Sequence, residues 1–133
     1  MAKNNLLIIS AHADDNIACA GSIFKLKESF GFVPYEIVLT GSELGQNFKS
    51  KKEVSEEINK EKRAEELSKA SKYLGIERSF QFNQPDLDLT YSKDLVFKIV
   101  KIIRSVKPKI VFLHNQYERI QTTKKLLKLD LAQ

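Results

Sequence analysis

The chain has 133 residues and a formal net charge of +5, and its length suffices for one domain with a buried core. Its lysines are interleaved with glutamates, and no basic strand carries the aromatic residues that stack on bases, so a nucleic-acid partner is not expected. A single cysteine excludes an internal disulfide, no apolar run is long enough to span a bilayer, and the N-terminus lacks a signal-peptide pattern, which together predict a cytoplasmic protein.

Apolar patterning predicts strands and helices in alternation along the chain. The predicted strands cover residues 6–10, 35–40, 79–83 and 110–113. The predicted helices cover residues 15–29, 51–74 and 92–106, ended respectively by Gly31, Gly75 and Pro108. A basic helix is also compatible with residues 121–133. Strands that alternate with helices predict an α/β fold, in which a mainly parallel sheet lies between two helical layers as an αβα sandwich.

One imidazole and two carboxylates follow the first predicted strand, in His12-Ala13-Asp14-Asp15. Ligands of open α/β sheets bind at the carboxyl ends of the strands, and this cluster falls there. Imidazole and carboxylate are zinc ligands, and a spare carboxylate can accept a proton from a water that the metal activates. The alternative is that Asp14 or Asp15 only caps the next helix and His12 is a polar strand end. Spacing does not separate these two interpretations.

Two further features lie after the second strand and on the long helix. Glu43, in the loop Ser42-Glu43-Leu44-Gly45, is a candidate for orienting a substrate, although an ordinary loop explains the segment as well. Arg63 and Glu66 share one helix face, where a surface ion pair is the simpler interpretation of a helix so rich in charge.

The last two candidates follow the third and fourth strands. Asp86 comes after Pro85 and is either a turn former or a carboxylate in a pocket. His114 follows the fourth strand, so a parallel sheet would bring it to the same edge as His12. A histidine at a strand end can also be simply a polar terminus.

Together these segments resemble the PIG-L / LmbE-like family of zinc-dependent N-acetylglucosamine deacetylases. The Ala-His-Pro-Asp-Asp and Gly-Glu-x-Gly motifs of that family are matched by Ala11-His12-Ala13-Asp14-Asp15 and Ser42-Glu43-Leu44-Gly45. Its Arg-x-x-Glu helix leading to Leu-Gly is matched by Arg63-Ala64-Glu65-Glu66 and Leu74-Gly75. Its later aspartate is matched by Asp86, and its entry to the fourth strand by Lys107-Pro108-Lys109. The correspondence runs from Leu6 to His114.

The resemblance implies a Rossmann-like fold and a hydrolase that removes the acetyl group from an N-acetylated amino-sugar conjugate. It implies His12 and Asp15 as ligands of a zinc ion and Asp14 as the general base. We add His114 as a further metal ligand at the neighbouring strand end. The candidates for substrate binding are Glu43, Arg63 and Asp86. A nucleotide-binding domain is disfavoured because no Gly-x-Gly-x-x-Gly follows the first strand.

The chain departs from this family after the fourth strand. The family carries a His-Pro-Asp-His type motif there, which supplies the remaining zinc ligand and a histidine that stabilises the oxyanion. This chain reads His114-Asn115-Gln116, and His12 is its one other histidine. We therefore expect a single domain over residues 1–133 that lacks the family's C-terminal part, has an atypical tail at 115–133 and holds zinc weakly. The alternative is a non-catalytic truncated member or a sugar-binding relic. A second copy could cover the sheet edge, so a homo-oligomer is also compatible with the sequence.

Overall fold

The computed structural model describes residues 4–44 and 55–114 of the chain. Its strands form one four-stranded parallel sheet in the order β3-β2-β1-β4. The strands are β1 (Asn5–Ser10), β2 (Val33–Thr40), β3 (Arg78–Gln84) and β4 (Ile110–Leu113). The helices are the 3-10 helix η1 (Asp15–Cys19) and the α-helices α1 (Ala20–Phe30), α2 (Glu56–Leu74) and α3 (Lys93–Val106).

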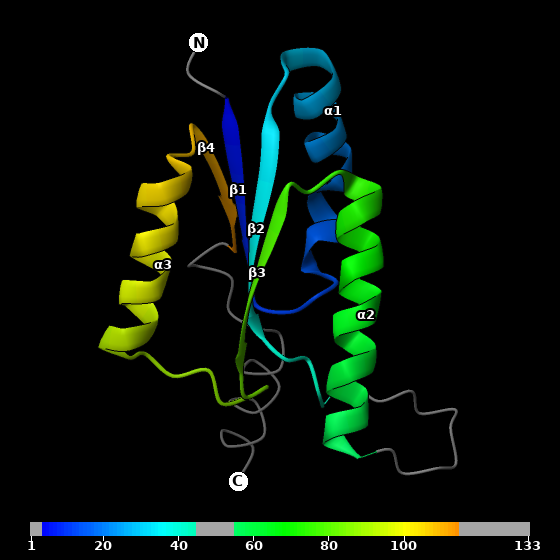
Figure 1. Ribbon diagram of the computed structural model, residues 1–133, viewed down its shortest axis with the longest axis vertical. Helices are drawn as coiled ribbons and strands as arrows, with labels where there is room; N and C mark the ends of the chain where they lie inside the picture. Colours follow the sequence, from blue (N-terminus) through cyan, green and yellow to red (C-terminus); the bar gives the residue numbers. More distant parts are fainter. Residues whose placement is uncertain (1–3, 45–54, 115–133) are drawn as a thin grey trace, which may run out of the picture.

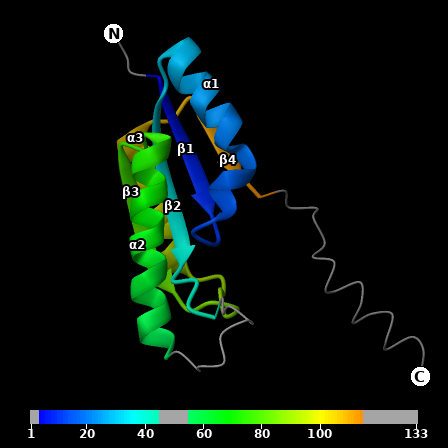
Figure 2. The same ribbon diagram turned by 90° about the vertical axis from the view of Figure 1, so that its right-hand side faces the viewer.

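The sheet lies between two helical layers, which confirms the predicted αβα arrangement. Helices α1 and α2 cover one face and α3 covers the other (Figure 1). Figure 2 shows α1 and α2 side by side in front of the sheet. Within the described ranges, no helix has the length and apolar character needed to cross a lipid bilayer.

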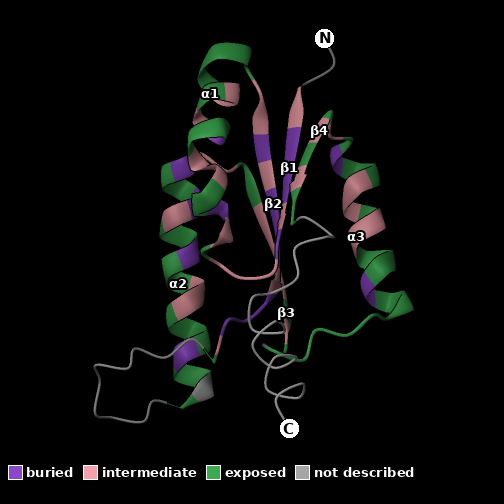
Figure 3. Ribbon diagram, turned by 180° about the vertical axis from the view of Figure 1, so that it is seen from behind, coloured by how far each residue is buried: buried purple, intermediate pink, exposed green. Residues whose placement is uncertain are grey.

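Strand β1 is continuously apolar because it lies between β2 and β4 and is covered on both faces. Leu6, Leu7 and Ile8 are all buried, as Figure 3 shows for the central strands. On the side of α1 and α2, the core cluster consists of Leu6, Ile8, Ile23 and Leu74. This cluster anchors α1 directly behind the turn that follows β1.

The first predicted helix begins at Asp15 as expected, but its first five residues are not α-helical. Residues 15–19 form the 3-10 helix η1, and the α-helix begins at Ala20. Cys19 breaks the regular geometry with φ −116° and ψ 10°, and no side-chain cap stabilises the start of η1 at Asp14. Apolar spacing does not detect such a change, because both helix types place side chains three residues apart on similar faces.

The other helix boundaries have clear local causes. Gly31 and Gly75 end α1 and α2 in the left-handed conformation, as predicted, with φ of 65° and 68°. The described part of α2 begins after Ser55, whose hydroxyl accepts a hydrogen bond from the Ile58 backbone N–H. The predicted helix start at Lys51, the predicted helix over 121–133 and the tail at 115–133 lie outside the described residues.

The strand order β3-β2-β1-β4 gives the sheet a topological switch point between β1 and β4. The chain leaves β1 toward α1 on one face and reaches β4 from α3 on the other, so the connections diverge between these two neighbouring strands. Such a divergence is where open α/β sheets bind ligands. His12 and His114 both follow strands that border this point.

Candidate active site

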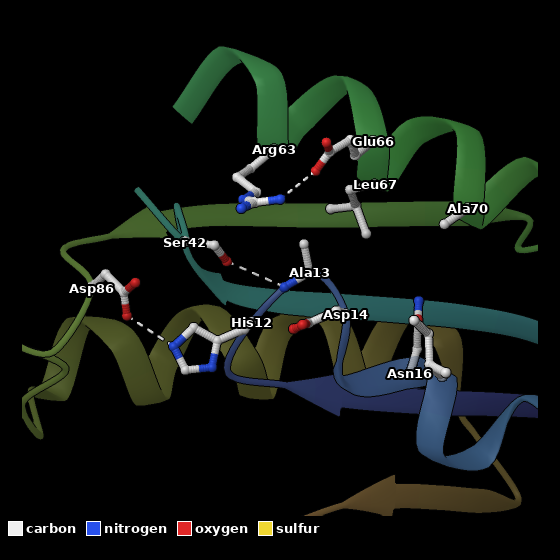
Figure 4. A pocket seen from close by; sticks show the side chains of 11 residues that line it. His12, Ala13, Asp14, Asn16, Ser42, Arg63, Glu66, Leu67, Ala70 and Asp86 are labelled. Atoms are coloured by element: carbon white, nitrogen blue, oxygen red, sulfur yellow. Dashed lines mark hydrogen bonds and ion pairs between the residues drawn. The ribbon is translucent and has the colours of Figure 1, made fainter. Parts of the chain in front are cut away.

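A pocket of about 460 Å³ lies between the turn after β1 and helix α2. Figure 4 shows His12 and Asp14 on one side of it and Arg63 and Glu66 on the other. The lining residues come from four segments of the chain: His12, Ala13, Asp14, Asn16, Ile17, Ser42, Arg63, Glu66, Leu67, Ala70 and Asp86. Four of the predicted site residues, namely His12, Asp14, Arg63 and Asp86, are therefore brought together in one pocket.

The ring of His12, which follows β1, is oriented by the carboxylate of Asp86, which follows β3. Its Nε2 donates to Oδ1 of the buried Asp86 at 2.8 Å. A carboxylate acceptor at Nε2 keeps the proton of the neutral imidazole on that nitrogen. The lone pair of Nδ1 is then free, and Nδ1 lies 3.9 Å from Oδ2 of Asp15.

The Asp15 carboxylate accepts hydrogen bonds from His12 in the same turn and from His114 after β4. Its Oδ2 accepts from the backbone N–H of His12 at 2.8 Å and from Nε2 of His114 at 2.9 Å. The predicted ligands His12, Asp15 and His114 therefore meet around one carboxylate oxygen. Asp15 and His114 also line a neighbouring cavity of about 210 Å³ between η1 and β4.

Asp14 has a different environment from Asp15. It is the N-cap residue of η1 but makes no side-chain capping hydrogen bond. Its carboxylate is exposed at the pocket, and among the described residues no hydrogen bond or ion pair engages it. The alternative that Asp14 serves as a helix cap is therefore not realised in this structure. A carboxylate without a structural partner is available for proton transfer.

Glu43 is not among the residues that line the pocket, but its side chain holds the backbone of Asp86. Its Oε1 accepts from the backbone N–H of Asp86 at 2.8 Å. Its other oxygen is buried without a partner among the described residues and lies 2.7 Å from where a Cβ on Gly41 would be, so a side chain at position 41 would displace this carboxylate. Glu43 does not line the pocket as described, and its predicted contact with substrate remains a prediction.

Helix α2 forms the opposite wall of the pocket. Nη1 of Arg63 lies 2.6 Å from Oε2 of Glu66, so the predicted ion pair is formed, and both side chains still line the pocket. Leu67 and Ala70 lie on the same helix face. Sequence reasoning missed Leu67 and Ala70, although their spacing of four and seven residues from Arg63 could have identified them.

Sequence reasoning also missed Asn16, which follows the aspartate pair directly and is buried. It accepts a weak hydrogen bond from the Cys19 thiol through its backbone carbonyl, at 3.4 Å. Burial raises the pKa of the Cys19 thiol, and the negative charge of Glu36 raises it further. On the exposed side of α2, the ion pair with Lys69 lowers the pKa of Glu65 and raises that of Lys69.

The donor chemistry at this edge fits zinc, whose protein ligands are imidazole nitrogens, carboxylate oxygens and thiolates. Nδ1 of His12 and Oδ2 of Asp15 face each other, and Asp86 supplies the outer hydrogen bond that zinc-binding histidines commonly make. Over residues 4–44 and 55–114, however, no group of three or more His, Cys, Asp or Glu side chains is arranged to hold a metal ion. The described residues thus offer two facing donors and not a complete ligand set.

The chain is similar to a hydratase in both sequence and structure. A curated relative, the 4-oxalmesaconate hydratase of Pseudomonas putida KT2440, is 30% identical over 115 residues, which are 85% of this chain and 44% of the relative. The solved 4-carboxy-2-hydroxymuconate hydratase of Pseudomonas putida KT2440 has a TM-score of 0.75 at 28% identity, with 86% of this chain and 49% of the other covered.

A second solved relative is a deacetylase. The N,N'-diacetylchitobiose deacetylase of Pyrococcus horikoshii has a TM-score of 0.76 at 26% identity, with 88% of this chain and 44% of the other covered. The chain spans about half the length of the relatives it matches. Residues 7–124 match the family described as PIG-L, GlcNAc-PI de-N-acetylase, and this range contains all of the residues that form the pocket. The chain therefore belongs to the PIG-L family.

Proposed function

We propose that this chain carries the water-activating pocket of a zinc-dependent hydrolase, which removes the acetyl group from an N-acetylated amino-sugar conjugate in the cytoplasm. The observation that carries the proposal is the carboxylate of Asp14, which has no partner among the described residues and lines a pocket beside the oriented ring of His12. The family description and the deacetylase relative support the reaction type.

In this proposal each residue near His12 has a separate role. His12 and Asp15 would hold the zinc ion, with His114 as a further ligand. Zinc bound there would polarise the amide carbonyl and make water more acidic. Asp14 would accept the proton of the attacking water and pass it to the departing amine. Asp86 would keep the His12 ring in the orientation that presents Nδ1.

A second candidate function is the addition of water to an unsaturated carboxylic acid, because the chain is similar to a hydratase in both sequence and structure. The charges of the pocket favour the sugar conjugate. Its carboxylates are Asp14, Glu66 and Asp86, and its guanidinium, that of Arg63, lies in an ion pair with Glu66. Away from the zinc ion, these side chains would repel a substrate with several carboxylates but not a neutral polyol.

A parallel assay of the two reactions tests the proposal. The 133-residue chain, supplied with Zn²⁺, would be incubated with N-acetylglucosamine and N,N'-diacetylchitobiose, and free amine would be measured with an amine-reactive dye. In the second arm, hydration of 4-carboxy-2-hydroxymuconate would be followed by the loss of its ultraviolet absorbance. We expect amine release and no hydration. Hydration without amine release would favour the second candidate. The absence of both reactions would favour a non-catalytic member of the family.

Replacing Asp86 by alanine is expected to weaken zinc binding by about 10–100-fold, because the His12 ring loses the acceptor that orients it. Competition with a chromophoric chelator measures this affinity. Asp88→Ala is the matched control, since Asp88 is an exposed carboxylate two residues further along. Equal zinc affinities for the two variants would contradict the role given to Asp86.

A further inference from the structure

We infer that Glu36 is a positioning residue for the turn that carries His12, Asp14 and Asp15. The inference rests on the proposed function only for the catalytic role of that turn. Glu36 lies in the middle of β2 and its side chain is 0% exposed. A carboxylate at such a position loses its hydration, which is costly unless donors replace the water.

Two buried donors reach Glu36 from the two walls of the pocket. Nδ2 of Asn16 donates to Oε2 at 3.0 Å, and the hydroxyl of Ser71 donates to Oε1. Asn16 lies in η1, directly after Asp15, and Ser71 lies on α2 next to the pocket residue Ala70. We call Glu36, Asn16 and Ser71 the Glu36 network. It ties the turn after β1 to the helix that faces it across the pocket.

The side chain of Asn16 depends on this network for its orientation. Asn16 is 1% exposed, and its Oδ1 is buried without a hydrogen-bond partner. Among the described contacts, the hydrogen bond to Glu36 is therefore what fixes the orientation of the Asn16 side-chain amide. No ion pair joins Glu36 to a cation in the part of the chain that the structure describes, so the two donors are what stabilise its carboxylate.

Removal of the Glu36 carboxylate would leave two buried donors unpaired. Leaving such groups unsatisfied costs more than the net strength of the bonds themselves. The turn can relieve this cost by moving Asn16, and the adjacent Asp15 must then move with it. The movement would lengthen the hydrogen bond in which the His12 backbone N–H donates to Oδ2 of Asp15, now 2.8 Å. The His12 amide therefore reports the position of Asp15 without metal or substrate.

Residue-resolved hydrogen exchange of the metal-free, full 133-residue chain tests the inference. The measured quantity is the exchange rate of the His12 amide divided by that of the Ile8 amide in β1. We expect Glu36→Ala to raise this ratio about tenfold or more, the factor that corresponds to losing one buried hydrogen bond. Glu36→Gln should keep the wild-type ratio, because its oxygen can accept from Asn16 and its amide can donate to the Ser71 hydroxyl.

Two further variants separate positioning from general destabilisation. Val106→Ala removes buried volume on α3, across the sheet from Glu36, and should lower stability without raising the ratio. Asn16→Ala cuts the network from the side of the turn and should raise the ratio as Glu36→Ala does. It also serves as the test if Glu36→Ala does not fold.

An unchanged ratio in Asn16→Ala, or an equal rise in Glu36→Gln and Glu36→Ala, would overturn the inference. Since the readout needs neither zinc nor substrate, its outcome is independent of the amine-release assay. Amine release with an unchanged exchange ratio would leave the proposed function standing and reject the role of Glu36.

Discussion

Replacing Asp14 by asparagine is expected to slow acetyl release by about 10²–10⁴-fold, the usual contribution of a general base. Asparagine has almost the same shape as aspartate but cannot accept a proton from water. Steady-state rates of amine release, measured at saturating substrate and Zn²⁺, give the comparison. Asp88→Asn provides the matched control because Asp88 is exposed and does not line the pocket.

The structure explains why this loss should not come from misfolding. The Asp14 carboxylate caps no helix and binds none of the described residues, so its replacement removes no structural contact. The free energy of unfolding of Asp14→Asn should therefore stay within about 0.5 kcal/mol of the wild-type value. A decrease in rate of less than tenfold would reject Asp14 as the general base. A large loss of stability would show that Asp14 has a structural role.

Replacing Ile23 by alanine is expected to lower the free energy of unfolding by about 2–5 kcal/mol. Ile23 is 0% exposed and packs with Leu6, Ile8 and Leu74 between β1 and the helices. The truncation removes buried apolar surface and leaves a cavity, and a domain of this size has a total stability of only about 5–15 kcal/mol. Urea unfolding followed by circular dichroism measures the change.

Ile58→Ala is the control for the same chemical change at an exposed site. Ile58 is 57% exposed near the start of α2, so its truncation should change stability by less than about 0.5 kcal/mol. Similar losses in both variants would mean that Ile23 does not lie in the cooperative core.

Much of the fold could be predicted from local patterns. The strand at 110–113 agrees with β4, and the α-helix predicted at 92–106 agrees with α3 to within one residue. Both segments have strong signals, a continuous apolar run and a one-sided apolar face ended by Pro108. The 3-10 helix at 15–19 was not predictable in this way, because its short turns depend on how the chain leaves β1.

Sequence reasoning did not single out Glu36. A charged residue between Tyr35 and Ile37 suggests a strand face that meets water, yet Glu36 is fully buried. Its partners, Asn16 and Ser71, are 20 and 35 residues away in the chain. No local pattern indicates that two donors will meet a carboxylate from opposite helical segments, so this network was visible only after folding.

In the candidate site too, some features follow from the local sequence and others only from tertiary packing. Strand ends, helix caps and the chemistry of His12, Asp14 and Asp15 are local properties, and they follow from residue types and spacing. The pairing of His12 with Asp86, 74 residues away, and of Asp15 with His114, 99 residues away, depends on the order of strands in the sheet. Packing of whole elements sets that order. It gave Asp15 and His12 oriented partners and left the Asp14 carboxylate without a partner among the described residues.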